Sequence, residues 1–121
     1  MNNKQLLELL KTDVEGFNQY RKENPKQRID FSHADLRDAN LWGADLSDVD
    51  LGGAELNKAN LRYADLNSAD LNNADLRDVD LSHADLSHAD LFNANLCGAD
   101  LSDANSSNAY FGYADLKGAK Q

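Results

Sequence analysis

Residues 59–78 read ANLRYADLNSADLNNADLRD, which is four copies of one five-residue unit. Each unit has Ala, then Asp or Asn, then Leu, then two variable residues. The unit continues in unbroken frame in both directions, from residue 29 to residue 119. Its central position is Leu at fifteen of eighteen sites, with Phe31, Ser106 and Phe111 as the exceptions. The chain therefore contains an internal repeat with a period of five residues.

The two positions before the Leu are nearly as regular. The first is Ala at sixteen of nineteen sites, and the second is Asp or Asn at sixteen of nineteen. The other two positions are polar or small and vary freely. The exceptions are Ile29, Val49 and Val79 at the Ala position and Glu55, Tyr110 and Lys120 at the Asp position.

A period of five residues matches neither an α-helix nor a β-strand. A helix would rotate the Leu stripe by about 140° per repeat and spread it around the whole circumference. A strand would place the Leu of alternate repeats on opposite sides. The pattern predicts a chain that turns at every repeat and returns Leu and Ala to one interior.

Units such as ADLRD, ANLWG and AELNK resemble the A-(D/N)-L-x-x motif of the pentapeptide repeat family, over residues 29–119. The resemblance implies an all-β solenoid: a right-handed quadrilateral β-helix over residues 29–121, with four repeats per coil and about 4.5 coils. Repeats twenty residues apart would then stack, and we call each stack a face. The first to fourth faces begin with the repeats centred on Phe31, Leu36, Leu41 and Leu46.

Residues 1–28 carry no repeat and are predicted to form a helical cap, with helices at about 2–11 and 13–24. Thr12 and Glu15 match a capping box, which places a break between the two helices. The segment could bind a partner or a membrane surface, but we favour a cover for the first coil, which would otherwise expose β edges. Its apolar stripe is Leu6, Leu10, Val14 and Phe17.

Charge restricts the classes of partner. The chain of 121 residues has a net charge of -9 and a pI near 4.5. Residues 1–28 carry +2 and residues 29–121 carry -11. Such a rod should bind neither nucleic acid directly nor an anionic membrane. The N-terminus is too charged for a secretory signal, and no run reaches the roughly 18 apolar residues of a membrane span, so we expect a cytoplasmic location.

Catalytic and metal-binding signatures are lacking. The acids are repeated and equivalent, whereas a catalytic acid needs a distinctive environment. Cys97 is the only cysteine, and we expect it to be inert. His33, His83 and His88 fall on three different faces. We therefore expect no enzyme, no cofactor and no metal.

One surface patch departs from the Asp, Asn and Ser background. It holds aromatic and arginine side chains, which are enriched at binding hot spots. Local packing or a cation–π contact explains the same residues equally well. The candidate partner-binding residues are Trp42, Arg62 and Tyr63 on the third face, with Arg37, Lys58 and Arg77 beside them on the second.

The last coil is the least regular. Ser106, Tyr110, Phe111 and Tyr113 break the pattern there, three of them with aromatic rings. Such decay can mark a tolerant end of the repeat. It can also mark an association surface, most simply for a second copy placed end to end.

Three functions remain open on the sequence. The first is a non-catalytic protein-interaction scaffold, with another protein as partner. The second is a DNA-mimicking modulator of DNA gyrase or topoisomerase, an activity known in the family that the repeats resemble. The net charge of -11 over roughly 22 Å of rod is about one charge per 2 Å, near the ~1.7 Å of duplex DNA. The third is a structural module of a larger protein.

Overall fold

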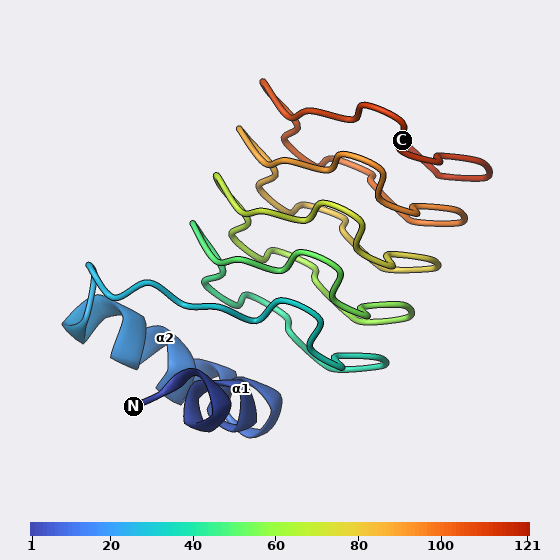
Figure 1. Cartoon of the computed structure of the whole chain (residues 1–121). Helices are drawn as coiled ribbons and strands as arrows, with labels where there is room; N and C mark the ends of the chain where they lie inside the picture. Colours follow the sequence, from blue (N-terminus) through green and yellow to red (C-terminus); the bar gives the residue numbers. More distant parts are fainter.

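The computed structural model describes all 121 residues. Two helices, α1 (Asn3–Thr12) and α2 (Val14–Glu23), lie against one end of a stack of coils (Figure 1). The coils form a right-handed β-helix, as predicted. Fifteen parallel bridges hold it together, and every one joins residues twenty positions apart, from Asp30–Asp50 to Asp100–Lys120. The register of the stack is therefore set by four repeats.

The repeat at residues 64–68 shows how the backbone is satisfied. Four of its five N–H groups donate to carbonyls, one within the turn, one in the previous coil and two in the next. These bonds run from Ala64 to Leu61 (3.0 Å), Asp65 to Ala44 (2.9 Å), Leu66 to Asp85 (2.7 Å) and Ser68 to Ser87 (2.9 Å). The fifth N–H, of Asn67, donates to the side-chain Oδ1 of Asp65 at 2.9 Å. No amide is left over, which buried backbone requires.

Each repeat turns at its fifth position. All eighteen fifth-position residues have positive φ, between 54° and 75°, and only four of them are glycine. The turn is closed by a hydrogen bond from the N–H of the Ala position to the carbonyl of the central residue three positions earlier. The bond from Ala34 to Phe31, at 3.1 Å, is an example, and the turn is of type II. Ten of the other fourteen are Asp, Asn or His, the residues that enter the left-handed region most readily.

Leu and Ala fill the interior. The central Leu residues from Leu36 to Leu96 are completely buried, and Val49 and Val79 fit in place of Ala without becoming exposed. The last coil differs. Leu101, Phe111 and Leu116 are only partly buried there.

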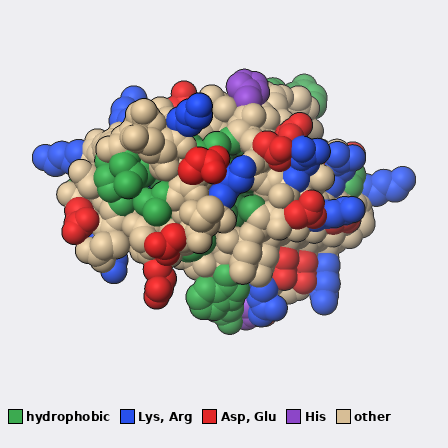
Figure 2. Space-filling model, turned by 90° about the horizontal axis from the view of Figure 1, so that it is seen from below, with side chains coloured by type: hydrophobic (Ala, Val, Ile, Leu, Met, Phe, Trp, Pro, Cys, Tyr) green, Lys and Arg blue, Asp and Glu red, His purple; other side chains and the backbone are tan.

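The helices cover the first coil with their apolar stripe. Leu6, Leu10 and Phe17 are completely buried, and the rings of Phe17 and Phe31 lie 6.0 Å apart. Neither helix is long and apolar enough to cross a membrane. Seen from the helical end, Lys and Arg side chains are interspersed with Asp and Glu (Figure 2).

Polar side chains of the cap also occupy the hydrogen-bonding edge of the first coil. Asn18 Oδ1 accepts the N–H of Asp45 at 2.8 Å, where later coils use a carbonyl of the coil before. Arg21 donates to the carbonyl of Ser47. The cap thus satisfies edge groups that an uncovered β edge would leave open.

The capping box predicted at Thr12 and Glu15 is wrong. Asp13 caps α2 instead, accepting the N–H of Gly16 at 2.9 Å. Thr12 is the last residue of α1, and its hydroxyl donates to the carbonyl of Glu8 at 2.8 Å. A capping box does occur one helix earlier, between Asn2 and Gln5.

Candidate functional site

The Asp and Asn columns have a structural role. Sixteen side-chain Oδ1 atoms at this position accept the N–H two residues on, at 2.8–3.3 Å. Glu55, Tyr110 and Lys120 are the three positions that do not: the Glu and Tyr side chains make no such bond, and Lys120 has no residue two positions on. The repeat therefore needs an acceptor here, and Asn serves as well as Asp.

The acids differ in their electrostatic surroundings. On the second face, hydrogen bonds from the guanidinium groups of Arg37 and Arg77 lower the pKa of Asp35 and Asp75. Burial raises the pKa of Asp65 on the fourth face, and Asp45 and Asp85 contribute to the same effect. The repeats of the second face therefore neutralise part of their own charge, whereas on the fourth face the only basic partner is Arg21 of the cap, beside Asp45.

The candidate patch on the third face is a stack of rings. Trp42 and Tyr63 lie with ring centroids 5.3 Å apart, and the Arg62 guanidinium sits 6.0 Å from the Tyr63 ring. His83 stacks on the other side of Tyr63 at 4.7 Å and 4°. His83 was not among the residues predicted for the patch, although it stands twenty positions after Tyr63 in the same column. We call Trp42, Arg62, Tyr63 and His83 the ring stack.

Arg37 and Lys58 lie apart from the ring stack. Arg37 binds Asp35 through two hydrogen bonds of 2.8 and 2.7 Å, and approaches Glu55 at 3.6 Å. Lys58 is exposed on the second face. Both residues belong to the second face, next to the face of the ring stack, and are not part of the ring stack.

A hollow of about 540 Å³ adjoins the ring stack. It lies where the junction of α1 and α2 meets the rod, so the cap contributes to the same surface. Its lining residues are Lys11, Thr12, Asp13, Val14, Glu15, Asn40 and Trp42.

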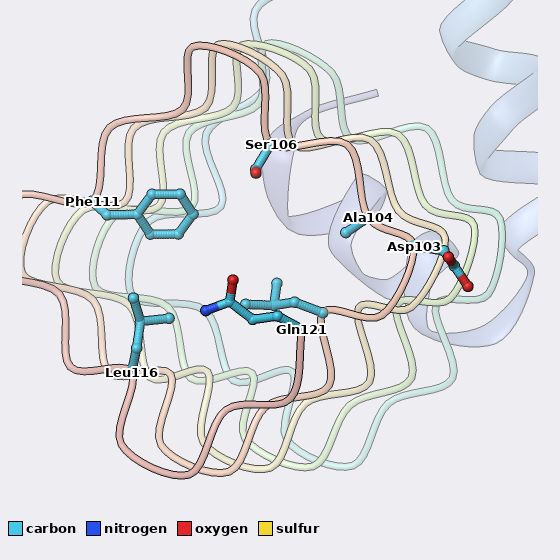
Figure 3. A pocket seen from close by; sticks show the side chains of 7 residues that line it. Asp103, Ala104, Ser106, Phe111, Leu116 and Gln121 are labelled. Carbon is cyan, nitrogen blue, oxygen red and sulfur yellow. The ribbon is translucent and has the colours of Figure 1, made fainter.

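The four candidates in the last coil separate into two places. Ser106 and Phe111 line a hollow of about 330 Å³ at the last coil of the β-helix, together with Leu101, Leu116 and others (Figure 3). Tyr110 and Tyr113 stand on the outside of the first face instead, beside Phe92. The end of the rod and its flank are thus different surfaces.

The three histidines and the cysteine lie on four different faces. No group of three His, Cys, Asp or Glu side chains is arranged to hold a metal ion. A hydrogen bond with Asp115, followed by burial, raises the pKa of the Cys97 thiol. A raised pKa disfavours the thiolate, which is the reactive form.

Solved structures resemble this one. A pentapeptide repeat protein from the cyanobacterium Cyanothece 51142 has a TM-score of 0.76 at 36% identity, over 78% of this chain and 65% of its own. A pentapeptide repeat protein from the Arabidopsis thaliana thylakoid lumen has a TM-score of 0.64 at 36% identity, over 66% and 56%. Another pentapeptide repeat protein, from Nostoc PCC 7120, is 39% identical over 98% of this chain and 74% of its own, with a TM-score of 0.40.

The chain spans less than two thirds of the length of the first two of these proteins. No curated protein matches it by sequence. The family profile of pentapeptide repeats, in eight copies, matches residues 27–53, 54–92 and 89–120. The chain therefore belongs to the pentapeptide repeat family.

Proposed function

We propose that the chain is a non-catalytic protein-interaction module whose partner binds the ring stack. One observation carries the proposal: Trp42 and Tyr63 are 54% and 49% exposed although they are large and apolar. Residues of these types, with Arg, contribute most of the binding energy at protein interfaces.

The ring stack is also held rigidly. Tyr63 is fixed between Trp42 and His83, and its backbone is locked in the left-handed region at φ 59°. Side chains that are already ordered lose little conformational entropy when a partner binds.

The proposal includes a rod that is quadrilateral in section, with about 4.5 coils, and a location in the cytoplasm. The two residues of each bridge are twenty positions apart, which supports four repeats per coil and hence the quadrilateral section. A straight, rigid support would hold the ring stack in one orientation toward its partner.

A triple variant tests the ring stack. We expect Trp42→Ser, Arg62→Ser and Tyr63→Asn together to abolish capture of the partner from a lysate of the source organism, measured by quantitative mass spectrometry. The fold should persist, because Ser82 and Ser102 already occupy the column of Trp42 and Arg62, and Asn tolerates positive φ.

Lys117→Ser is the control, since it removes a long exposed side chain from the second face. Partners that remain bound to the triple variant would contradict the proposal. Loss of the same partners with Lys117→Ser would also contradict it.

We further propose that the hollow at the end of the rod pairs two copies. Leu101, Phe111 and Leu116 offer the apolar surface. Light scattering over a hundredfold concentration range should give the mass of a dimer. Ser106→Arg should give a monomer, because it puts a charge into the hollow at an already exposed position. A monomer for the unchanged chain would contradict this proposal.

A modulator of DNA gyrase is the second candidate. The charge density of the rod favours it, but roughly 22 Å matches only about six or seven base pairs, so the dimer would be needed to double the length. Absence of any effect on gyrase supercoiling at micromolar protein would eliminate this candidate.

A further inference from the structure

The flank of the last coils carries a second aromatic cluster, distinct from the ring stack. Phe92 and Tyr110 stack with parallel rings 6.1 Å apart, and Tyr113 meets Phe92 edge to face at 5.7 Å. Phe92, Tyr110 and Tyr113 are 38%, 56% and 84% exposed. We call these three residues the flank cluster.

The flank cluster departs from two features that most of the other repeats share. Tyr110 stands where sixteen repeats have an Asp or Asn oxygen, so the N–H of Gly112 lacks the usual side-chain acceptor. Tyr113 adopts φ 57°, a conformation that suits Gly, Asn and Asp far better than an aromatic residue. Departures that weaken local structure tend to occur at functional sites.

The charges around the flank cluster indicate what it binds. The first and fourth faces carry eight acids and no Lys or Arg. All six basic residues of the repeats lie on the other two faces: Arg37, Lys58, Arg62, Arg77, Lys117 and Lys120. The acidic half of the rod therefore has no basic side chain of its own repeats to neutralise it.

The cap neutralises only the near end of this half. Arg21 approaches Asp45 at 3.7 Å, and Arg28 lines a hollow with Asp30 and Asp50. Asp70 lines the same hollow as Arg28, whereas Asp90, which is next to the flank cluster, makes no ion pair. Their Oδ1 atoms accept the N–H groups of the repeat, and their Oδ2 atoms have no partner within the chain.

Asp90 and the rings are adjacent. Asp90 pairs with Tyr110 in the bridge between coils, and it accepts the N–H of Phe92 at 3.0 Å. A cation above the Tyr110 or Phe92 ring could thus reach a free carboxylate oxygen as well. An arginine suits this combination best, because its planar guanidinium stacks on rings and bonds carboxylates.

The same face is hollowed further along. A depression of about 370 Å³ lies around Gly52 and Gly53, between Asp50 and Asp70. From Asp50 to Tyr110 is three coil spacings, or about 14 Å, which an extended chain covers with four or five residues at ~3.3 Å each.

We propose that the first face binds an extended, arginine-containing segment of a partner protein, with one arginine held between the flank cluster and Asp90. The aromatic rings supply the anchor, and Asp70 and Asp50 receive further basic side chains. This site goes beyond the proposed function, since it uses neither the ring stack nor the open end.

A labelled peptide of eight arginines is the probe, and its affinity is measured by fluorescence anisotropy. The variant Phe92→Ser, Tyr110→Asn and Tyr113→Asn keeps the net charge and restores the repeat pattern. We expect it to bind about five- to tenfold more weakly. Its melting temperature should not fall, because Asn at 110 can accept the N–H of Gly112 and Asn at 113 suits positive φ.

Paired charge variants locate the binding. Asp70→Asn with Asp90→Asn should weaken binding at least threefold more than Asp80→Asn with Asp100→Asn, which removes the same charge from the third face.

Unchanged affinity of the aromatic variant would overturn the proposal. Equal weakening by the two charge pairs would overturn it too, because it would show diffuse attraction to an acidic rod.

Discussion

Leu71→Ala is expected to lower the free energy of unfolding by about 3 kcal/mol. Leu71 is completely buried in a middle coil, between Leu51 and Leu91 of the same column. Removing its side chain leaves a cavity in the interior. The β bridges fix the backbone of each coil to its neighbours, so the coil cannot close around the cavity. Each coil contacts only its neighbours, and a defect in the middle therefore weakens both halves of the stack.

Urea unfolding followed by circular dichroism measures this effect, with Leu116→Ala as the matched control. Leu116 is the same residue type in the same repeat position but lies partly exposed at the end hollow. Its loss should cost only about 1 kcal/mol, since less apolar surface returns to water. Equal losses for the two variants would contradict the closed interior described above.

Asp85→Ala is expected to cost about 2 kcal/mol, whereas Asp85→Asn should cost less than about 1 kcal/mol. The Oδ1 of Asp85 accepts both the N–H of Ser87 at 2.9 Å and its hydroxyl at 2.6 Å. Ser87 is buried, so Ala would leave two donors without an acceptor or water. Asn keeps the acceptor and removes only the charge, as Asn60 and Asn95 already do in other repeats.

The reverse change strengthens the test. Glu55→Asp should stabilise the chain by about 1 kcal/mol, because Asp can reach the N–H of Asn57. All three variants can be compared by thermal melting at pH 7. If Asp85→Asn were as harmful as Asp85→Ala, the charge rather than the hydrogen bond would be what the repeat requires.

The repeat made most of the fold predictable. A period of five excluded helix and strand, and the identity of the central residue located the interior. The helices were placed within about one residue of their bounds, Asn3–Thr12 and Val14–Glu23. The capping box was misplaced because Thr12 and Asp13 both have side chains that can cap, and only the geometry decides which one does.

The surface was less predictable. Phe92 joins Tyr110 and Tyr113 although they lie eighteen and twenty-one positions later, and His83 joins Tyr63 across one coil. Applying the twenty-residue offset to every variable position would have found the pair of Tyr63 and His83. It would not have found the flank cluster, because Phe92, Tyr110 and Tyr113 stand at three different positions of the repeat. The hydrogen bonds of Asn18 and Arg21 could not be found in this way, since they depend on how the helices lie on the first coil.

In most repeats the backbone donors are satisfied by carbonyls of the turn and of the neighbouring coils and by one Asp or Asn oxygen, as the repeat at residues 64–68 shows. The fourth residue of the repeat contributes only its main chain to that scheme. Its side chain can therefore be exchanged without altering the hydrogen bonds that define the fold. The rod is in effect a regular grid of interchangeable positions about 4.8 Å apart along its axis. At the fourth position, recognition can therefore change independently of folding, so a new binding specificity can arise there while the scaffold stays the same.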